Sequence, residues 1–179
     1  MTVDIRQATE DDIEGLYALY AKIDKHDEGY FETCFEKDCL ILLAESSVVV
    51  ALNEESPHDK ELVGFVILNF EPKYQLYQKL EIPEIQDLNV LPDYRRQGIG
   101  SHLVEVCENI TAEQGIEQIG ISVGLTKDYG PAQRLYTQAG YIPDGYGVTY
   151  DRQAIDKGQT HPVNDDLCLM MVKSLLEID

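Results

Sequence analysis

The chain has 179 residues, 44% of them hydrophobic, and its 33 acidic and 14 basic residues give a formal net charge of −19. This length can bury one ordinary core and is short for two, so we expect a single domain over residues 1–179. A charge this negative repels nucleic acid and anionic membranes, which excludes a nucleic-acid-binding protein. The charge either serves solubility or draws a cationic substrate to an acidic cleft.

Targeting and metal-binding signals are not visible in the sequence. No apolar run approaches the ~20 residues of a membrane-spanning helix, and the start MTVDIRQATEDD lacks the plan of a secretory signal. We therefore expect a cytoplasmic protein with no membrane partner. The cysteines form no CxxC pair and have no histidine at ligand spacing, so we expect buried thiols and neither a metal site nor disulfides. They are Cys34, Cys39, Cys107 and Cys168.

The first part of the chain predicts a strand, a helix and a hairpin. The opening VDIRQAT alternates like a strand, and TEDDIEGLYALYAKI carries apolar residues at helical spacing behind a Thr9-x-x-Asp12 start signal. From Gly29 to Glu45 the pattern stays open, because CLILLA suits a buried strand and a helix equally. VVVALN and ELVGFVILNF are predicted strands, joined by the polar connection NEESPHDK.

The middle of the chain predicts a loop, a strand and a long helix. EPKYQLYQKLEI is interpreted as a loop, and residues 84–90 as a strand that Leu91-Pro92-Asp93 ends. Apolar residues then recur at helical spacing from Ile99 to Ile110, until Gln114-Gly115 stops the helix.

The last part predicts a strand, a helix and two more strands. IEQIGISVGL has strand character, and PAQRLYTQAGY is a predicted helix with Pro131 at its first position and Gly140 just past its end. Further strands are expected near residues 147–152 and 167–173. This order of elements indicates an α+β fold with one mixed central sheet.

The stretch LPDYRRQGIGSHL joins a predicted strand to a predicted helix. The first amides of a helix lack internal partners and the helix dipole is positive there, so this turn attracts an anion. Gly98 and Gly100 would let a phosphate approach the backbone, and Arg95 and Arg96 would add charged donors. The P-loop and dinucleotide fingerprints do not fit, the latter because Leu103 stands where a third glycine belongs. A solvent-facing turn is the alternative interpretation.

Two motifs in the chain resemble those of the GCN5-related N-acetyltransferase (GNAT) superfamily. Residues 95–100, RRQGIG, are similar to its R/Q-x-x-G-x-G/A signature, and residues 132–141, AQRLYTQAGY, are similar to its A-x-x-L-Y…G-F/Y helix. The order of elements agrees over nearly the whole chain, and the resemblance is to a bacterial branch whose substrates are not settled. It implies a mixed, mostly antiparallel sheet of six to seven strands, flanked by helices, with strands four and five splayed apart.

The resemblance also implies acetyl transfer from acetyl-CoA to an amine, without a metal. The backbone amides of residues 97–101 would hold the pyrophosphate, and the pantetheine arm would pair with the backbones of the fourth and fifth strands. Tyr129 departs from the family, which often has Asn three residues before the helix alanine. The implied cofactor-binding residues are Leu88, Asn89, Val90, Arg95, Arg96, Gln97, Gly98, Ile99, Gly100, Ser101, Val123, Gly124, Tyr129 and Ala132.

Three residues are catalytic candidates. A primary amine with a pKa near ~10 is mostly protonated at neutral pH, so a carboxylate, acting directly or through water, would help it to attack. Glu84 is the first candidate, because its place on the fourth strand resembles that of a general-base glutamate in several relatives. Asp87 is the second, although strict alternation puts it on the opposite face unless a bulge resets the phase. Both could be solvated strand-end charges instead.

Tyr136 resembles the family tyrosine that gives a proton or a hydrogen bond to the leaving thiolate, and the alternative is an ordinary core tyrosine. Tyr74 and Tyr77 could wall an acceptor pocket or cover the core. The leading hypothesis is an N-acetyltransferase that acts on a small cationic primary amine. The alternatives are a protein or peptide amine as acceptor and a catalytically silent acetyl-CoA-binding module. A monomer and a homodimer are both compatible with the sequence.

Overall fold

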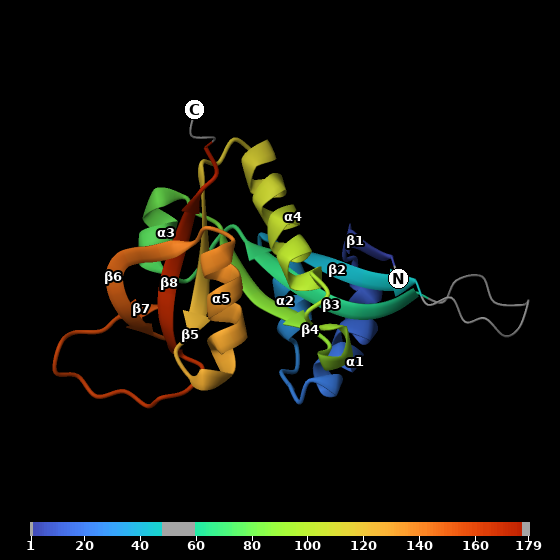
Figure 1. Ribbon diagram of the computed structural model, residues 1–179, viewed down its shortest axis with the longest axis horizontal. Helices are drawn as coiled ribbons and strands as arrows, with labels where there is room; N and C mark the ends of the chain where they lie inside the picture. The colour runs from blue at the N-terminus through green and yellow to red at the C-terminus, as the bar shows by residue number, and fades with distance from the viewer. Residues whose placement is uncertain (1, 48–59, 177–179) are drawn as a thin grey trace, which may run out of the picture. The chain divides into compact units, whose positions relative to one another are not determined.

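The computed structural model describes residues 2–47 and 60–176 of the chain, and Figure 1 shows the order of their helices and strands. Eight strands of these described residues form one sheet in the order β1-β2-β3-β4-β5-β8-β6-β7. The strands are β1 (Val3–Gln7), β2 (Cys39–Ser47), β3 (Lys60–Asn69), β4 (Glu84–Val90), β5 (Gln118–Gly124), β6 (Ile142–Tyr150), β7 (Gln153–Ala154) and β8 (Leu167–Ser174). The helices are α1 (Ile13–Lys22), α2 (Tyr30–Glu36), α3 (Gln75–Leu80), α4 (Ile99–Glu113) and α5 (Gly130–Gln138). The predicted α+β class is confirmed, whereas the expected number of six to seven strands is too low by at least one, because the short pair β6–β7 adds a strand to the edge of the sheet.

The chain forms two compact units, each built from two segments. The first unit comprises residues 1–68 and 87–105, and the second comprises residues 69–86 and 106–179. The chain passes from one unit to the other at the last residue of β3, inside β4 and inside α4, so each of these elements contributes residues to both units.

Aromatic rings fill the core of the first unit. Tyr20 of α1, Phe31 of α2 and Phe65 of β3 are buried, with ring centroids 4.7 to 5.7 Å apart. Leu16, one helical turn before Tyr20, and its neighbour Leu19 extend this cluster along α1. Burial of these side chains fixes α1 and α2 against β3.

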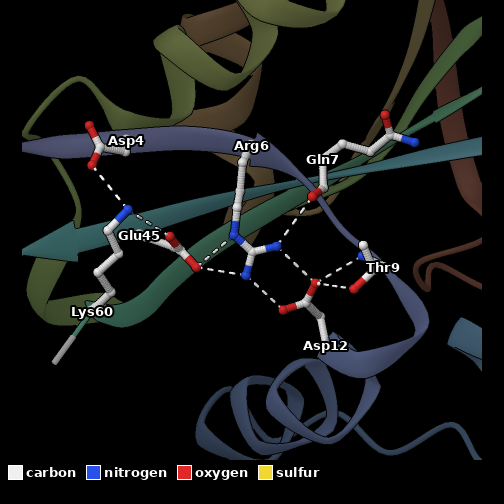
Figure 2. Close-up of polar contacts among 7 residues, drawn as sticks. All are labelled: Asp4, Arg6, Gln7, Thr9, Asp12, Glu45 and Lys60. Carbon is white, nitrogen blue, oxygen red and sulfur yellow. Dashed lines mark hydrogen bonds and ion pairs between the residues drawn. The ribbon is translucent and has the colours of Figure 1, made fainter.

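An ion cluster ties the first strand to the turn before α1 (Figure 2). Arg6 on β1 donates to both carboxylate oxygens of Asp12 at 2.7 and 2.8 Å, and its Nε donates to Glu45 on β2 at 2.8 Å. The backbone N–H of Thr9 donates to Asp12 at 2.8 Å, so the predicted start signal is confirmed. The hydrogen bond from Arg6 is the main cause that lowers the pKa of Asp12 to about 2.

A close approach between a tyrosine and a glycine organises the second unit. Tyr77 of α3 is fully buried, and its hydroxyl donates to the backbone carbonyl of Met171 at 2.6 Å. A Cβ on Gly120 of β5 would lie 2.2 Å from the Tyr77 ring, so only glycine fits there. Tyr74 is also buried beside Tyr77, which places both tyrosines in the core of this unit.

The strand pairings of the second unit are mostly antiparallel. β5 and β6 each pair with β8, and β7 pairs with β6, all in antiparallel orientation. The start of β4 pairs in parallel with β5, through Glu84 with Gly120 and Ile85 with Ile121. Among the described residues this register covers two residues of each strand, which is the short pairing expected of strands that diverge.

Several expectations are corrected. The stretch 29–45, which the sequence left open, forms α2 and then most of β2, so CLILLA is a strand. The loop interpretation of residues 71–82 is wrong, because Gln75–Leu80 form α3. A helix of six residues spans fewer than two turns and shows too little periodicity to be recognised. The predicted strand VVVALN and all of the connection NEESPHDK except its last residue, Lys60, lie within residues 48–59, outside the described residues. Lys60 is the first residue of β3.

None of the helices in the described part of the chain is long and apolar enough to cross a membrane. None of the four cysteines forms a disulfide, and three of them are buried while Cys39 is half-buried. Burial is the main cause that raises the pKa of Cys107 to about 12, so this thiol stays protonated at neutral pH.

Candidate functional site

The predicted phosphate loop lies between β4 and α4, in the first unit. The backbone N–H of His102 donates to the carbonyl of Gly98 at 3.0 Å, which closes the first turn of α4. By helix geometry, the amides of residues 99–101 point out of this N-terminus. Ile99 is buried and anchors the helix, whereas residues 95–98 and Ser101 are exposed. The loop therefore presents donors and positive charge to solvent while one apolar side chain fixes it.

Two backbone conformations shape this loop. Gly98 has φ of +84°, and no atom of the described residues lies within 4 Å of the position that a Cβ would take, so the glycine opens space beside the helix N-terminus. Arg96 also has a positive φ, of 60°, which is uncommon for a residue with a side chain. The Nε of Arg95 donates to the carbonyl of Val90 at 2.9 Å. This bond joins the loop to the end of β4, where the predicted pantetheine-binding residues Leu88, Asn89 and Val90 lie.

Asp87 interrupts the regular geometry of β4. Its φ is +49°, and a left-handed residue within a strand is a feature of a β-bulge, so strict alternation does not hold here. The side chain is 12% exposed. Its carboxylate accepts hydrogen bonds from the hydroxyl of Tyr20, from Lys25 Nζ at 2.6 Å and from Asn89 Nδ2 at 2.8 Å. Asp87 is thus an ion-paired carboxylate and no solvated strand-end charge.

The charge of Asp87 acts on neighbouring tyrosines. Burial raises the pKa of the Tyr20 hydroxyl well above its usual range, and the negative charge of Asp87 raises it further. Burial and the same carboxylate raise the pKa of Tyr30. These two phenols therefore remain hydrogen-bond donors throughout the physiological pH range.

Glu84, the first candidate base, lies at the start of β4 in the second unit, and its side chain is 0% exposed. One carboxylate oxygen accepts hydrogen bonds from Nε and Nη2 of Arg152 at 3.3 and 3.2 Å. The other accepts a bond from Gln86 Nε2 at 2.8 Å. Nη2 of Arg152 also donates to the hydroxyl of Ser122 on β5 at 2.9 Å. Glu84 is therefore a buried carboxylate whose charge is matched by a cation.

The end of β5, which holds the predicted cofactor residues Val123 and Gly124, meets Tyr129 at Gly124. A Cβ on Gly124 would lie 2.4 Å from the Tyr129 ring, so the ring packs directly on the backbone of this glycine. Gln133 of α5 donates to the carbonyl of Gly124 at 2.9 Å. Val123 is buried and pairs with Leu169 of β8. Tyr129 thus lies against the predicted pantetheine-binding backbone, while Ala132 is half-buried on the first turn of α5.

Tyr136, the candidate proton donor, lies on α5 and is 6% exposed. Its ring meets that of Tyr141 edge to face, with 6.2 Å between centroids. Lys173 Nζ lies 5.8 Å from the centre of the Tyr141 ring and pairs with Glu108 at 2.7 Å. Burial, and next the charge of Glu108, raise the pKa of Tyr141. Tyr136 therefore belongs to a group of buried aromatic and charged side chains.

The sequence did not reveal the partner of Glu84. Arg152 lies 68 positions away along the chain, in a turn whose Asp-Arg pair carries no strong hairpin signal. The sequence predicts a strand over residues 147–152, whereas the structure ends β6 at Tyr150 and leaves Arg152 in the turn. Within residues 2–47 and 60–176, no group of three or more His, Cys, Asp or Glu side chains could hold a metal ion.

A family model and two named relatives match the sequence of this chain. A model of the acetyltransferase (GNAT) family matches residues 10–141. The chain is 30% identical over 146 residues to the aminoalkylphosphonate N-acetyltransferase of Salmonella typhimurium strain LT2, an alignment that covers 82% of this chain and 89% of that protein. It is 27% identical over 135 residues to an uncharacterized N-acetyltransferase of Archaeoglobus fulgidus, covering 69% and 84% of the two chains.

Solved structures show the same fold at lower sequence identity. Arabidopsis thaliana NAA60 in complex with acetyl-CoA superposes with a TM-score of 0.69 at 18% identity, over 97% of this chain and 98% of that one. The ribosomal-protein-S18-alanine N-acetyltransferase of Escherichia coli gives a TM-score of 0.67 at 14% identity, over 99% and 97% of the two chains.

Proposed function

We propose that the acceptor of this member of the acetyltransferase (GNAT) family is a small cationic primary amine. As a member of that family, the chain is an N-acetyltransferase that uses acetyl-CoA. The observation that carries the proposal is Glu84, a fully buried carboxylate already matched by a positively charged side chain. A buried carboxylate is stable only beside a cation or in protonated form, so its surroundings suit an ammonium group. The net charge of −19 favours the same class of acceptor.

The cofactor roles in this proposal follow the resemblance residue by residue. The amides of residues 97–101 bind the pyrophosphate, with Arg95 and Arg96 as charged contacts. The backbones of residues 88–90, 123 and 124 bind the pantetheine arm, and Tyr129 and Ala132 contribute to the same arm. The open space beside Gly98 and the exposure of residues 95–98 support the first of these roles.

The chemistry has three proton-dependent steps. Glu84, directly or through water, takes a proton from the acceptor ammonium, and Asp87 is the second candidate for this role. The neutral amine attacks the thioester carbonyl, the carbon–sulfur bond breaks, and the thiolate takes a proton from Tyr136. The nitrogen of the new amide then loses its extra proton through water, which returns Tyr136 to the phenol, and Glu84 releases its own proton to solvent. The low exposure of Tyr136 supports a donor that transfers its proton to the leaving group in preference to water.

A second candidate acceptor is an aminoalkylphosphonate, favoured by the 30% identity to the Salmonella typhimurium enzyme of that name. Such an acceptor carries the same primary amine, together with an anionic phosphonate that a charge of −19 repels at long range. The sequence is also compatible with a protein or peptide amine as the acceptor, and with a chain that binds acetyl-CoA without turnover. The cytoplasmic location stays a prediction.

The release of free coenzyme A, with mass detection of the acetylated product, tests these acceptors in one panel. The panel holds n-propylamine, a polyamine, 2-aminoethylphosphonate and a short peptide with a free N-terminus. We expect the two cationic amines to be acetylated fastest. Preferred use of 2-aminoethylphosphonate would establish the second candidate acceptor. If none of the four amines caused release of coenzyme A, the proposed acceptor class would be contradicted.

A further inference from the structure

Arg152 lies in a turn whose backbone conformation is unusual for its residues. Tyr150 of β6 pairs with Gln153 of β7, so Asp151 and Arg152 form a two-residue hairpin loop. Their φ angles are +49° and +61°, the signature of a turn that favours Asn, Asp and Gly. A left-handed backbone conformation is energetically unfavourable for an arginine, and strained residues of this kind are concentrated at functional sites, where a side chain must be held in one position. Here the turn directs the guanidinium to Glu84.

The bonds between Arg152 and Glu84 are long for a charge-assisted pair. Two guanidinium nitrogens share one carboxylate oxygen at 3.2 and 3.3 Å, whereas such bonds are usually about 2.7–2.9 Å. The cluster in Figure 2 gives the contrast within the same chain, because Arg6 reaches both oxygens of Asp12 at 2.7 and 2.8 Å. The Arg152–Glu84 contact therefore has the geometry of an exchangeable pair.

Burial is unequal across this pair. The side chain of Glu84 is 0% exposed, and that of Arg152 is 23% exposed. Arg152 can therefore return to water by a short movement of its side chain, but Glu84 cannot. If Arg152 moved away and no other cation replaced it, the buried carboxylate of Glu84 would remain without a counter-ion, which costs free energy. If another cation took its place, the charge of Glu84 would stay matched throughout.

We propose that Arg152 is an internal counter-ion: it pairs with Glu84 while no acceptor is bound, and the ammonium group of a cationic acceptor displaces it. This inference rests on the proposed function and names a specificity-determining residue for it. A neutral or anionic acceptor cannot replace the guanidinium without leaving Glu84 unpaired, so Arg152 stays and keeps such acceptors out. A cationic acceptor exchanges with Arg152, and the released turn relaxes.

The exchange predicts that Arg152 competes with every cationic acceptor. Removing the guanidinium should tighten the binding of n-propylammonium by about tenfold, the effect of removing a competitor worth about 1.4 kcal/mol. Glu84→Gln should weaken the same binding, since the amide carries no charge. Lys73→Ala is the matched control, because Lys73 pairs with Asp151 of the same turn at 2.6 Å and both side chains are more than half exposed.

Calorimetric titration of n-propylammonium at neutral pH, without acetyl-CoA, into the parent, Arg152→Ala, Glu84→Gln and Lys73→Ala chains makes the test. We expect tighter binding in Arg152→Ala, weaker binding in Glu84→Gln and unchanged binding in Lys73→Ala, each with native circular dichroism. Equal or weaker binding in a folded Arg152→Ala chain overturns the proposal, as does an equal gain in Lys73→Ala.

A second measurement uses the parent chain, and it tests the same proposal if the Arg152→Ala chain does not fold. The Nε–H resonance of Arg152, identified by its loss in Arg152→Lys, should shift as n-propylammonium is added, because its hydrogen bond to Glu84 breaks. A resonance that stays in place while the amine binds, or the absence of any amine binding, overturns the proposal. The proposed function can fail independently of the Arg152 proposal. That outcome is a shift of this resonance on addition of the amine, while the acceptor panel yields no acetylated cationic amine.

Discussion

Asp12 and Glu84 are both carboxylates paired with arginine, yet they do different work in the chain. Asp12 lies at the surface turn before α1, is bonded through both oxygens and holds β1 to that turn. Glu84 is buried and meets its arginine through one oxygen only. The first arrangement suits a permanent contact that supports the fold, and the second has the geometry of the exchange that we propose for Arg152.

Asp12→Asn should make stability less dependent on pH. The folded-state pKa of Asp12 is about 2, below its ordinary value of 3.8, mainly because Arg6 donates to it. A depressed pKa contributes stability that is present above pH ~4 and lost as pH falls toward 2. We expect a loss of about 1 kcal/mol at pH 7, after allowance for solvent screening.

Urea unfolding at pH 7 and pH 2.5 measures this difference, with Asp11→Asn, an exposed position of the same turn, as the control. The gap in unfolding free energy between the parent and Asp12→Asn should narrow at the lower pH. A gap of equal size at both pH values would show that the ionised form of Asp12 does not stabilise the fold.

Tyr136→Phe should lower kcat with little change in acetyl-CoA affinity. The substitution keeps the buried ring against Tyr141 but removes the hydroxyl proton, and loss of a general acid costs roughly a hundredfold in rate. Tyr77→Phe is the control, because its hydroxyl donates to a backbone carbonyl in the core and its loss should affect stability alone. If Tyr136→Phe turns over like the parent on an identified amine, Tyr136 is structural.

Candidate site residues could be chosen from the sequence where a local motif marks them, and their roles stay predictions. Tyr136 and Gly98 stand in short patterns, and Glu84 stands at a fixed distance from the end of its strand. Arg152 could not be found in this way, because its partner is 68 positions away and its turn residues are atypical. Contacts that depend on the fold, such as those of Asp87 with Tyr20 and Lys25, are hidden for the same reason.

Helices and strands could be predicted from the sequence where they are long enough and where their apolar residues show a clear period. β4 and α4 were found because Pro92 and Gly115 mark their ends and, in α4, apolar residues recur at helical spacing. β2 stayed open because six consecutive residues, 41–46, are buried, so it shows no alternation to separate a strand from a helix. α3 was missed because six residues carry too little of the helical period.

The loop before α4 gives the element-scale prediction. Gly98→Glu should weaken acetyl-CoA binding at least tenfold, because it adds bulk and a negative charge where the pyrophosphate is proposed to lie. Gly158→Glu is a matched control: this glycine also has a positive φ, of +96°, with open space around it, but it stands in the connection between β7 and β8. Both variants carry the same backbone strain.

Calorimetry with acetyl-CoA separates the two variants of this pair. We expect Gly158→Glu to bind like the parent and Gly98→Glu to lose most of its affinity, with both chains folded. Equal affinities would mean that the phosphates are held elsewhere. Gly100→Glu should repeat the loss, since its backbone belongs to the first turn of the same helix.

At the scale of the whole molecule, composition and the order of elements were enough to predict the fold class and the excess of negative charge. The strand order β5-β8-β6 could not be derived, because it joins segments far apart in the chain. The charge of −19 attracts cations over distances that salt shortens, with a Debye length of ~8 Å at physiological ionic strength. The KM for a cationic acceptor should therefore rise with salt.

We propose that this N-acetyltransferase selects a cationic amine as its acceptor. The most direct test is the ratio of kcat/KM for n-propylamine to that for 2-aminoethylphosphonate, measured at low and at physiological salt. We predict a ratio of at least about tenfold in favour of n-propylamine at low salt, falling as salt rises because the attraction is screened. A ratio below one, together with a KM for n-propylamine that salt does not change, would contradict the account.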